Sequence, residues 1–290
     1  FRTIKPSLII SVPLIIEKII KKKVFPTLKK PGVRLMLSLP LVSTKIKQTI
    51  RQKVIEAFGG NFKEVIIGGA ALNKEVEDFL HSIRFPYTVG YGMTECGPIL
   101  AYDGWETFKQ GSCGKTAPRM RLRIDSSDPE RVVGEILAKG DNVMTGYYKN
   151  EEATQAAFTP DGWLRTGDLG LIDKDGYLYI KGRSKNMILG PNGQNIYPEE
   201  IEDQLNNLPF VAESIVVERD NKLVALIYPD FEAAKAAHAD TEEALRETME
   251  NNRTEINKLL PAYSQIARVE IYREEFKKTP KRSIKRYLYQ

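Results

Sequence analysis

Cysteine and histidine are scarce in this chain of 290 residues, which contains two of each. Two dispersed cysteines do not make a disulfide framework, and together with His81 and His238 they show no zinc-binding spacing. No apolar run reaches the roughly 20 residues that a membrane-spanning helix needs, because Ser11 and Pro13 interrupt the longest one. These absences exclude a small disulfide-rich domain and predict a reducing, cytoplasmic location.

The overall composition is that of a folded protein, with 42% hydrophobic and 28% charged residues. This balance excludes global disorder, and the length predicts two or three domains. The formal net charge is +5, and residues 273–286 carry seven basic side chains against two acidic ones. Because a nucleic-acid-binding protein usually spreads its basic residues over a face, we expect no nucleic-acid partner. The basic tail is then either a solvated end or a site for a local anionic ligand.

Residues 1–110 alternate between strand-like and helix-like patterns. Such alternation predicts a layered αβ domain, in which ligand sites lie at the C-terminal ends of the strands. The expected strands are residues 7–12 and 65–67, and the expected helices are residues 13–23, residues 43–58 and a helix capped by Asn73.

Residues 111–182 have frequent Gly, Asp and Pro between short β-rich runs, which predicts a small β-rich subdomain. Its strongest local signal is Asp173–Gly176, a hairpin turn between two apolar runs. A junction at residues 183–186 then leads into a third region. The predicted fold is therefore mixed α/β, with the β-rich subdomain between two larger parts.

Residues 183–290 predict a compact α+β domain that moves about a hinge at residues 183–186. Pro198 and the two acids after it open a helix, and Asp220–Asn221 forms a turn between two strands. Thr241 caps a long helix. The apolar residues expected on one face of this helix are Leu245, Met249, Ile256, Leu259 and Leu260.

The glycines at residues 111–114 do not form a nucleotide-binding P-loop. That motif requires glycine five positions before its Gly-Lys pair, and Lys109 occupies this position. A glycine-rich turn is the better interpretation.

The segment Tyr91–Glu95 has the chemistry of a nucleotide site. Gly90 and Gly92 permit close approach of the backbone to a ligand. Thr94 offers a hydroxyl to a phosphate oxygen, Glu95 is an oxygen ligand suited to Mg²⁺, and Tyr91 offers a flat face to a base. An ordinary turn is the alternative interpretation of the same five residues.

Two further motifs follow. Gly162–Asp168 places an aspartate just past a glycine turn, where it is suited to accept both hydroxyls of a ribose. Gly182–Asn186 precedes a second glycine-rich segment, Gly190–Glu200. In this order and spacing, the motifs resemble the adenylate-forming superfamily, which includes acyl-CoA synthetases, luciferases and the adenylation domains of peptide synthetases. The segments Gly68–Leu72, Gly111–Pro118 and Gly134–Tyr148 are similar to that family as well, and Lys5–Ile19 and Lys185–Glu202 most resemble its long-chain fatty-acid CoA ligase branch.

The resemblance implies an ATP-dependent acyl-CoA ligase. A fatty acid or other carboxylate would attack the α-phosphate of ATP, and the thiol of coenzyme A would then displace AMP from the acyl-adenylate. The implied ligands are ATP and AMP, Mg²⁺, and coenzyme A. Cations must screen the meeting of two anions in the first step.

The resemblance also implies roles for individual residues of the first two regions. Gly68, Gly69 and Ala70 would line the adenine and acyl pocket. Tyr91 and Gly92 would contact adenine, Thr94 the phosphate and Glu95 the Mg²⁺ ion, so that Thr94 and Glu95 count as catalytic. Asp168 would bind the ribose hydroxyls, and Ile180 would pack on the base.

In the last region the resemblance implies roles for three residues. Arg183 would lie near the ribose, and Lys185 would be the hinge residue. Gly193 would lie near the channel for the pantetheine arm of coenzyme A.

Two features depart from the family pattern. The chain contains no Ser/Thr/Gly-rich phosphate-binding loop, so we expect the C-terminal part of a longer enzyme, inactive without the N-terminal half. An exposed apolar sheet edge and association, including homo-oligomers, would follow. Second, Ser283 stands where the family has a catalytic lysine, and Lys281 or Lys285 would serve only in a shifted register.

Two alternatives to a ligase stay open from the sequence. The first is a non-catalytic remnant that binds AMP or acyl-CoA. The second is an adenylation enzyme that loads a carrier protein. Peripheral membrane contact through Lys18–Lys23 and the basic tail would be an addition to any of these.

Overall fold

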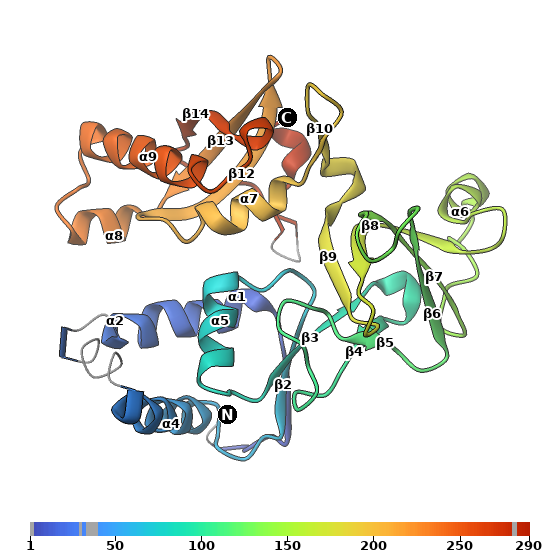
Figure 1. Ribbon diagram of the computed structural model, residues 1–290, viewed down its shortest axis with the longest axis horizontal. Helices are drawn as coiled ribbons and strands as arrows, with labels where there is room; N and C mark the ends of the chain where they lie inside the picture. Colours follow the sequence, from blue (N-terminus) through green and yellow to red (C-terminus); the bar gives the residue numbers. More distant parts are fainter. Residues whose placement is uncertain (1–2, 29–30, 33–39, 280–282) are drawn as a thin grey trace. The chain divides into compact units, whose positions relative to one another are not determined.

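The chain divides into two compact units, residues 1–180 and residues 181–290, each with its own sheet and core (Figure 1). Helices and both parallel and antiparallel strands occur, which confirms the predicted mixed α/β class. No helix in the described part of the chain is long and apolar enough to span a membrane. The computed structural model describes residues 3–28, 31–32, 40–279 and 283–290.

The first unit is built on a five-stranded sheet that begins with three parallel strands. β1 (Leu8–Ser11) pairs with β2 (Glu64–Gly68), which pairs with β3 (Tyr87–Gly92). β4 (Ile99–Tyr102) and β5 (Lys115–Thr116) continue the sheet in antiparallel fashion. Because β1, β2 and β3 run the same way, their C-terminal ends meet at one edge of the sheet.

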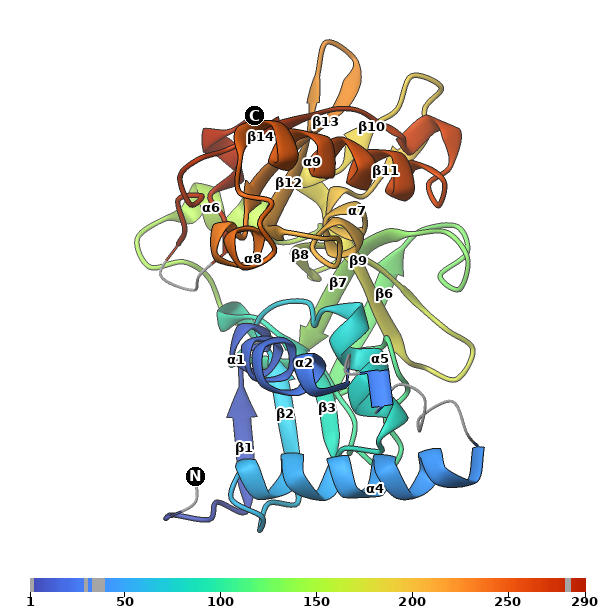
Figure 2. The same ribbon diagram turned by 90° about the vertical axis from the view of Figure 1, so that its left-hand side faces the viewer.

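Helices cover one face of these parallel strands (Figure 1, Figure 2). As predicted, Asn73 caps one of them, because its side chain accepts a hydrogen bond from the amide of Val76. The elements are α1 (Pro13–Ile19), a π-helical turn (Ile20–Val24), α2 (Phe25–Leu28), α4 (Pro40–Ala57) and α5 (Lys74–Ser82).

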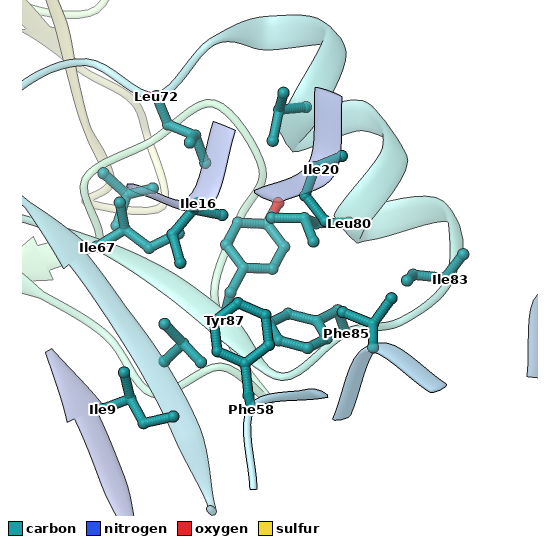
Figure 3. Packing of buried hydrophobic residues seen from close by; sticks show 14 of the residues in the cluster. Ile9, Ile16, Ile20, Phe58, Ile67, Leu72, Leu80, Ile83, Phe85 and Tyr87 are labelled. Atoms are coloured by element: carbon teal, nitrogen blue, oxygen red, sulfur yellow. The ribbon is translucent and has the colours of Figure 1, made fainter. Parts of the chain in front are cut away.

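The core between these helices and the sheet is dense in aromatic and branched side chains (Figure 3). Ile16 and Ile20 lie one helical turn apart and are almost fully buried. The ring of Phe85 packs 5.7 Å from the centroids of both Phe58 and Phe62. Burying each such side chain contributes about 1.5–3 kcal/mol, so this cluster fixes the helices on the sheet.

A second, four-stranded sheet follows, and its last strand continues past residue 180 into the second unit. Its strands are in sequence order, β6-β7-β8-β9, and the predicted turn at Asp173–Gly176 joins the last two. β5 belongs instead to the first sheet, and the expected domain division at residue 110 stays a prediction. The elements are β6 (Met120–Asp125), β7 (Gly134–Gly140), α6 (Glu151–Ala157), β8 (Leu164–Ile172) and β9 (Leu178–Arg183).

The second unit packs helices on a three-stranded sheet, and most of its predicted local signals are confirmed. Asp220 and Asn221 have φ of 54° and 59° in the turn between β12 and β13. The Thr241 hydroxyl accepts a hydrogen bond from the amide of Ala244 at the start of α9. The elements are β10 (Ile188–Leu189), β11 (Asn195–Ile196), α7 (Pro198–Leu205), β12 (Val211–Arg219), β13 (Lys222–Pro229), α8 (Phe231–Ala236), α9 (Glu242–Asn257) and β14 (Ile266–Ile271).

One expectation for α9 is wrong. The helix ends at Asn257, so Leu259 leaves the helical face and is 75% exposed, whereas Leu260 still packs against the core. Helical spacing stops predicting a shared face once the last turn ends.

Strand β1 lies at the edge of the first sheet. Its Leu8 and Ile10 side chains are 46% and 77% exposed. An exposed apolar edge of this kind is a template for pairing with another chain. The predicted association of the protein stays a prediction.

The β8–β9 turn is held by one carboxylate. Asp173 accepts hydrogen bonds from the amides of Asp175 and Tyr177, from the Tyr179 hydroxyl, and from the ammonium of Lys109 at 2.5 Å. Burial alone would raise the pKa of Asp173, but these donors outweigh it and lower the pKa to about 2. A carboxyl with a lowered pKa stabilises the fold above its ordinary pKa and loses that effect as the pH falls.

We therefore expect Asp173→Asn to lower the free energy of unfolding at pH 6 by at most about 2 kcal/mol, and by much less near pH 2.5. Urea unfolding at the two pH values measures the difference. Asp175→Asn is the matched control, because Asp175 pairs with the same lysine but is 52% exposed. Equal losses for Asp173→Asn at both pH values would contradict the assignment.

Candidate active site

The predicted glycine segments come together at the edge where the parallel strands end. Gly68 ends β2 beside Gly90 of β3, so residues 68–70 and 91–95 leave neighbouring strands at the same edge. A Cβ on Gly92 would lie 2.0 Å from the carbonyl oxygen of Pro98, so only glycine fits there. A Cβ on Gly69, where φ is +89°, would meet nothing within 4 Å. The surface beside Gly69 is therefore open to a ligand.

A tyrosine hydroxyl holds the Glu95 carboxylate at this edge. Glu95 lies in a 3₁₀ turn (Thr94–Cys96), where Thr94 is exposed. The hydroxyl of Tyr147 donates to Glu95 Oε1 at 3.1 Å, and the Glu95 carbonyl accepts the amide of Met144. Partial burial, this hydrogen bond and the Glu95 charge all raise the pKa of Tyr147. Tyr147 thus remains a neutral donor that orients the carboxylate.

Sequence reasoning did not assign a role to Tyr147. It lies 52 residues from Glu95, although it falls inside the family-like segment Gly134–Tyr148. That segment was the only available signal.

Asp168 is joined to the same edge by Tyr91. The Tyr91 hydroxyl donates to Asp168 Oδ2 at 2.6 Å, and both residues are buried. The amide of Asp168 donates to the hydroxyl of Thr166, and Gly167 has a φ of +70°. The expectation that Asp168 follows a turn is wrong, because Asp168 lies inside β8, and the positive φ of Gly167 is accommodated within the strand.

Cys113 lies near Asp168, and Ile180 is the remaining predicted site residue of the first unit. Burial raises the pKa of Cys113 to about 12, with further increases from the charges of Glu77 and Asp168, so this thiol is not a nucleophile. The backbone of Ile180 is within hydrogen-bonding reach of the same thiol, and the Ile180 side chain is 37% exposed. The packing of the Ile180 side chain on the base stays a prediction.

The site offers hard oxygen ligands to a cation but no complete metal cage. The described residues contain no group of three or more His, Cys, Asp or Glu side chains that could hold a metal ion. Mg²⁺ usually keeps several waters and binds one or two carboxylates together with substrate phosphates. Glu95 therefore fits a magnesium ion that arrives with a nucleotide.

Arg183, Lys185 and Gly193 belong to the second unit. Arg183 ends β9, and Lys185 is exposed in the 3₁₀ turn Ser184–Asn186. Asn186 donates to Glu199 at 2.6 Å, which ties this turn to the start of α7. Gly193 has a φ of +79° in the loop between β10 and β11. A common site of these residues with those of the first unit stays a prediction.

Two described segments of the basic tail pair in antiparallel fashion, and Lys285 lies opposite Lys277. The amide of Lys285 donates to the Lys277 carbonyl, and the amide of Thr279 donates to the Ser283 carbonyl, each at 2.8 Å. Ser283 is exposed. Lys281 lies outside the described residues. The choice between the two predicted lysines therefore stays open.

A buried ion pair that the sequence did not reveal anchors this tail. Arg286 donates to both carboxylate oxygens of Glu202, at 2.6 and 2.8 Å, and to the Val216 carbonyl. The Glu202 and Arg286 side chains are 12% and 14% exposed. Burial raises the pKa of Glu202 to about 7, against the opposing effects of Arg286 and the Val216 amide. This desolvated ion pair thus joins the C-terminal tail to the helix and strand that carry Glu202 and Val216.

Comparison with known families agrees with this geometry. The family profile "AMP-binding enzyme" matches residues 1–148, just over half of the chain, and "AMP-binding enzyme C-terminal domain" matches residues 185–289. The chain belongs to the AMP-binding enzyme family. Membership of the adenylate-forming superfamily, predicted from the motifs, is thereby confirmed.

Similar members of this family are named for different carboxylates. A long-chain-fatty-acid–CoA ligase of Mycobacterium bovis is 33% identical over 250 residues, covering 79% of this chain and 40% of the relative. An indoleacetate–CoA ligase of Aromatoleum aromaticum is 42% identical over 161 residues, covering 52% and 31%. O-succinylbenzoate coenzyme A synthetase of Bacillus subtilis, solved with AMP, is 26% identical with a TM-score of 0.66, covering 84% and 49%. The chain therefore spans less than half the length of each of these relatives.

The Arg286–Glu202 pair predicts that Arg286→Met destabilises the second unit by about 3 kcal/mol, because a buried carboxylate loses its partner. Urea unfolding and hydrogen exchange of the β12 amides measure the effect. Arg268→Met is the control, since Arg268 pairs with Glu270 but is 51% exposed, and such pairs contribute about 1 kcal/mol or less. A loss for Arg286→Met no larger than for the control would contradict the prediction.

Proposed function

We propose that this chain supplies the nucleotide-binding edge and the C-terminal domain of an ATP-dependent acyl-CoA ligase. The observation that carries the proposal is the Tyr91–Asp168 hydrogen bond, which joins two family motifs from different sheets. Bacillus subtilis O-succinylbenzoate coenzyme A synthetase, solved with AMP, with its acyl-adenylate and with ATP and magnesium, supports the same ligands here.

The proposed reaction has two displacement steps. An oxygen of the carboxylate attacks the α-phosphorus of ATP, and the bond from that phosphorus to the pyrophosphate oxygen breaks. The sulfur of coenzyme A then attacks the acyl carbon, the bond to the AMP oxygen breaks, and the thiol proton leaves to solvent. Both steps bring negative charge together, so placement of donors and cations controls the rate.

In the first unit, the proposed roles are supported by hydrogen bonds and by exposed surface. Asp168 Oδ2 accepts a hydrogen bond from the Tyr91 hydroxyl, and the Asp168 carboxylate accepts hydrogen bonds from the ribose hydroxyls. The open face beside Gly69 takes the adenine ring. Exposed Thr94 donates its hydroxyl to a phosphate oxygen, and Glu95 holds the magnesium ion that accompanies the phosphates.

The second unit supplies cations and the hinge in this proposal. Lys185 begins the mobile domain, Gly193 lines the pantetheine channel, and Lys285 or Lys281 faces the phosphates. We propose a long-chain fatty acid as substrate, because the Mycobacterium bovis relative is named for one. We also propose a cytoplasmic enzyme that contacts membranes peripherally. Because the 290 residues contain no Ser/Thr/Gly-rich phosphate loop, we expect nucleotide binding without thioester formation by this chain alone.

Ser283 favours one alternative, a protein that binds AMP or acyl-adenylate without turnover. Its side chain lacks the positive charge that a forming pyrophosphate requires. Nucleotide binding that persists while the full-length protein forms no thioester from ATP, fatty acid and coenzyme A would support this alternative.

We expect Asp168→Asn to weaken AMP binding about tenfold or more, because hydrogen bonds to a charged acceptor are lost. Tyr91→Phe keeps the ring but removes the hydroxyl that donates to Asp168, and a loss of about threefold is expected. Calorimetric titration of the chain with AMP measures both, and Asp175→Asn is the control. Binding of AMP by Asp168→Asn with the affinity of the unmodified chain would refute the nucleotide site.

Glu95→Gln should remove the dependence of ATP affinity on magnesium while leaving AMP binding intact, since the amide is a poor Mg²⁺ ligand. Tyr147→Phe should shift the magnesium concentration required without abolishing the dependence. Titration with ATP at a series of magnesium concentrations measures both effects. A wild-type magnesium response in Glu95→Gln would show that the ion is held elsewhere.

A further inference from the structure

A cavity of about 620 Å³ lies in the first unit at the opposite end of the parallel strands from the nucleotide edge. Tyr87, the first residue of β3, lines it, whereas Gly92 at the last position of the same strand leads to Glu95. Six residues of strand span about 17 Å, so the cavity is a separate place in the fold. Its walls come from α4, the end of α5, the start of β3 and the loop at residues 105–108.

The floor of the cavity is aromatic and rigid. Phe85 and Tyr87 are buried in the core shown in Figure 3, and their rings are held by neighbours. The Tyr87 ring meets the Phe108 ring edge to face at 5.3 Å, and Phe85 packs on Phe58 at 5.7 Å. Trp105 adds a further ring at the wall. Such a floor suits a planar, apolar body.

The polar part of the lining is cationic. Arg51, Arg84 and His81 line the cavity, against a single acid, Glu106. The Nε atom of Arg51 is sealed from solvent and has no hydrogen-bond partner. A buried donor without an acceptor is unfavourable, and a rearranged Arg51 side chain would present it to a ligand oxygen. Guanidinium groups match the planar geometry of carboxylates and the oxygens of phosphates.

The backbone conformation of Arg84 is unfavourable for arginine, which indicates a functional role for its side chain. Arg84 has a φ of +53° in the turn that ends α5, where its amide donates to the His81 carbonyl and the Phe85 amide to the Leu80 carbonyl. Glycine is the residue favoured at this left-handed position, and arginine is strained there. The strained position contributes an arginine to the cavity lining.

We propose that this cavity binds a small oxyanion with a planar aromatic body, a carboxylate or a phosphate monoester. Arg51 and Arg84 hold the anionic group, and the rings of Phe85, Trp105 and Phe108 contact the body. The site is independent of the proposed nucleotide site, because it uses none of the residues that carry it.

The experiment follows the fluorescence of Trp105 in a Trp163→Phe background, where it is the single remaining tryptophan. The probes are 4-fluorobenzoate, 4-fluorophenyl phosphate and the neutral 4-fluorobenzyl alcohol, with ¹⁹F line broadening as the second readout. Saturable binding of either anion is expected, with the neutral probe about tenfold weaker. The tighter of the two anions identifies the preferred oxyanion.

Arg51→Gln and Arg84→Gln should each weaken binding of the preferred anion about tenfold. Glu106→Gln should strengthen it, because a like charge is removed. Lys53→Gln, on the exposed side of the same helix as Arg51, removes an equal charge and should change the affinity less than twofold if direct contact matters more than net charge. Asp168→Asn should leave this binding unchanged, and Arg51→Gln should leave AMP binding unchanged.

Equal affinity for the neutral and anionic probes would overturn the proposal. Equal losses in Lys53→Gln and Arg51→Gln would also overturn it, since binding would then reflect net charge alone. Arg84 is exposed, so Arg84→Gln should fold normally and keeps the test decisive even where Arg51→Gln proves unstable.

Discussion

The parallel pairing of β1, β2 and β3 is the constraint on which the first unit depends. It brings Gly68 and Gly92 to one edge of the sheet, and the core of Ile16, Ile20 and Phe85 holds the strands in that register. Antiparallel pairing would have sent the two glycine segments to opposite ends. Everything proposed for nucleotide binding begins from this shared edge.

Carboxylates in this protein have two kinds of hydrogen-bond partner. One kind suits ligand binding, and the other contributes to stability. Glu95 and Asp168 each accept a hydrogen bond from a tyrosine hydroxyl, which orients the carboxylate without adding a positive charge. Glu202 is instead neutralised by Arg286 with both of its oxygens engaged. A tyrosine hydroxyl orients a carboxylate but leaves its charge uncompensated, whereas an arginine compensates the charge.

The two ends of strand β3 carry different proposed sites. Glu95 follows the end of β3, whereas Arg51 and Arg84 line a cavity at its beginning, where the Glu64 carboxylate accepts hydrogen bonds from the Tyr102 hydroxyl and the Trp105 amide. A carboxylate suits magnesium, and a lining of rings and guanidinium groups suits an organic anion. Both rest on the same packed core, which makes them rigid without making them one site.

The sequence by itself determined the local elements of this protein. Caps at Asn73 and Thr241 and the turn at Asp220–Asn221 were predictable, because capping and turn formation depend on residues only a few positions apart. The motifs also identified the family. Only the tertiary structure decided that Asp168 lies inside a strand and meets Tyr91, which is 77 residues away. It likewise decided the partners of Glu95 and Glu202, which are 52 and 84 residues distant, since no local pattern encodes which buried groups meet across a fold.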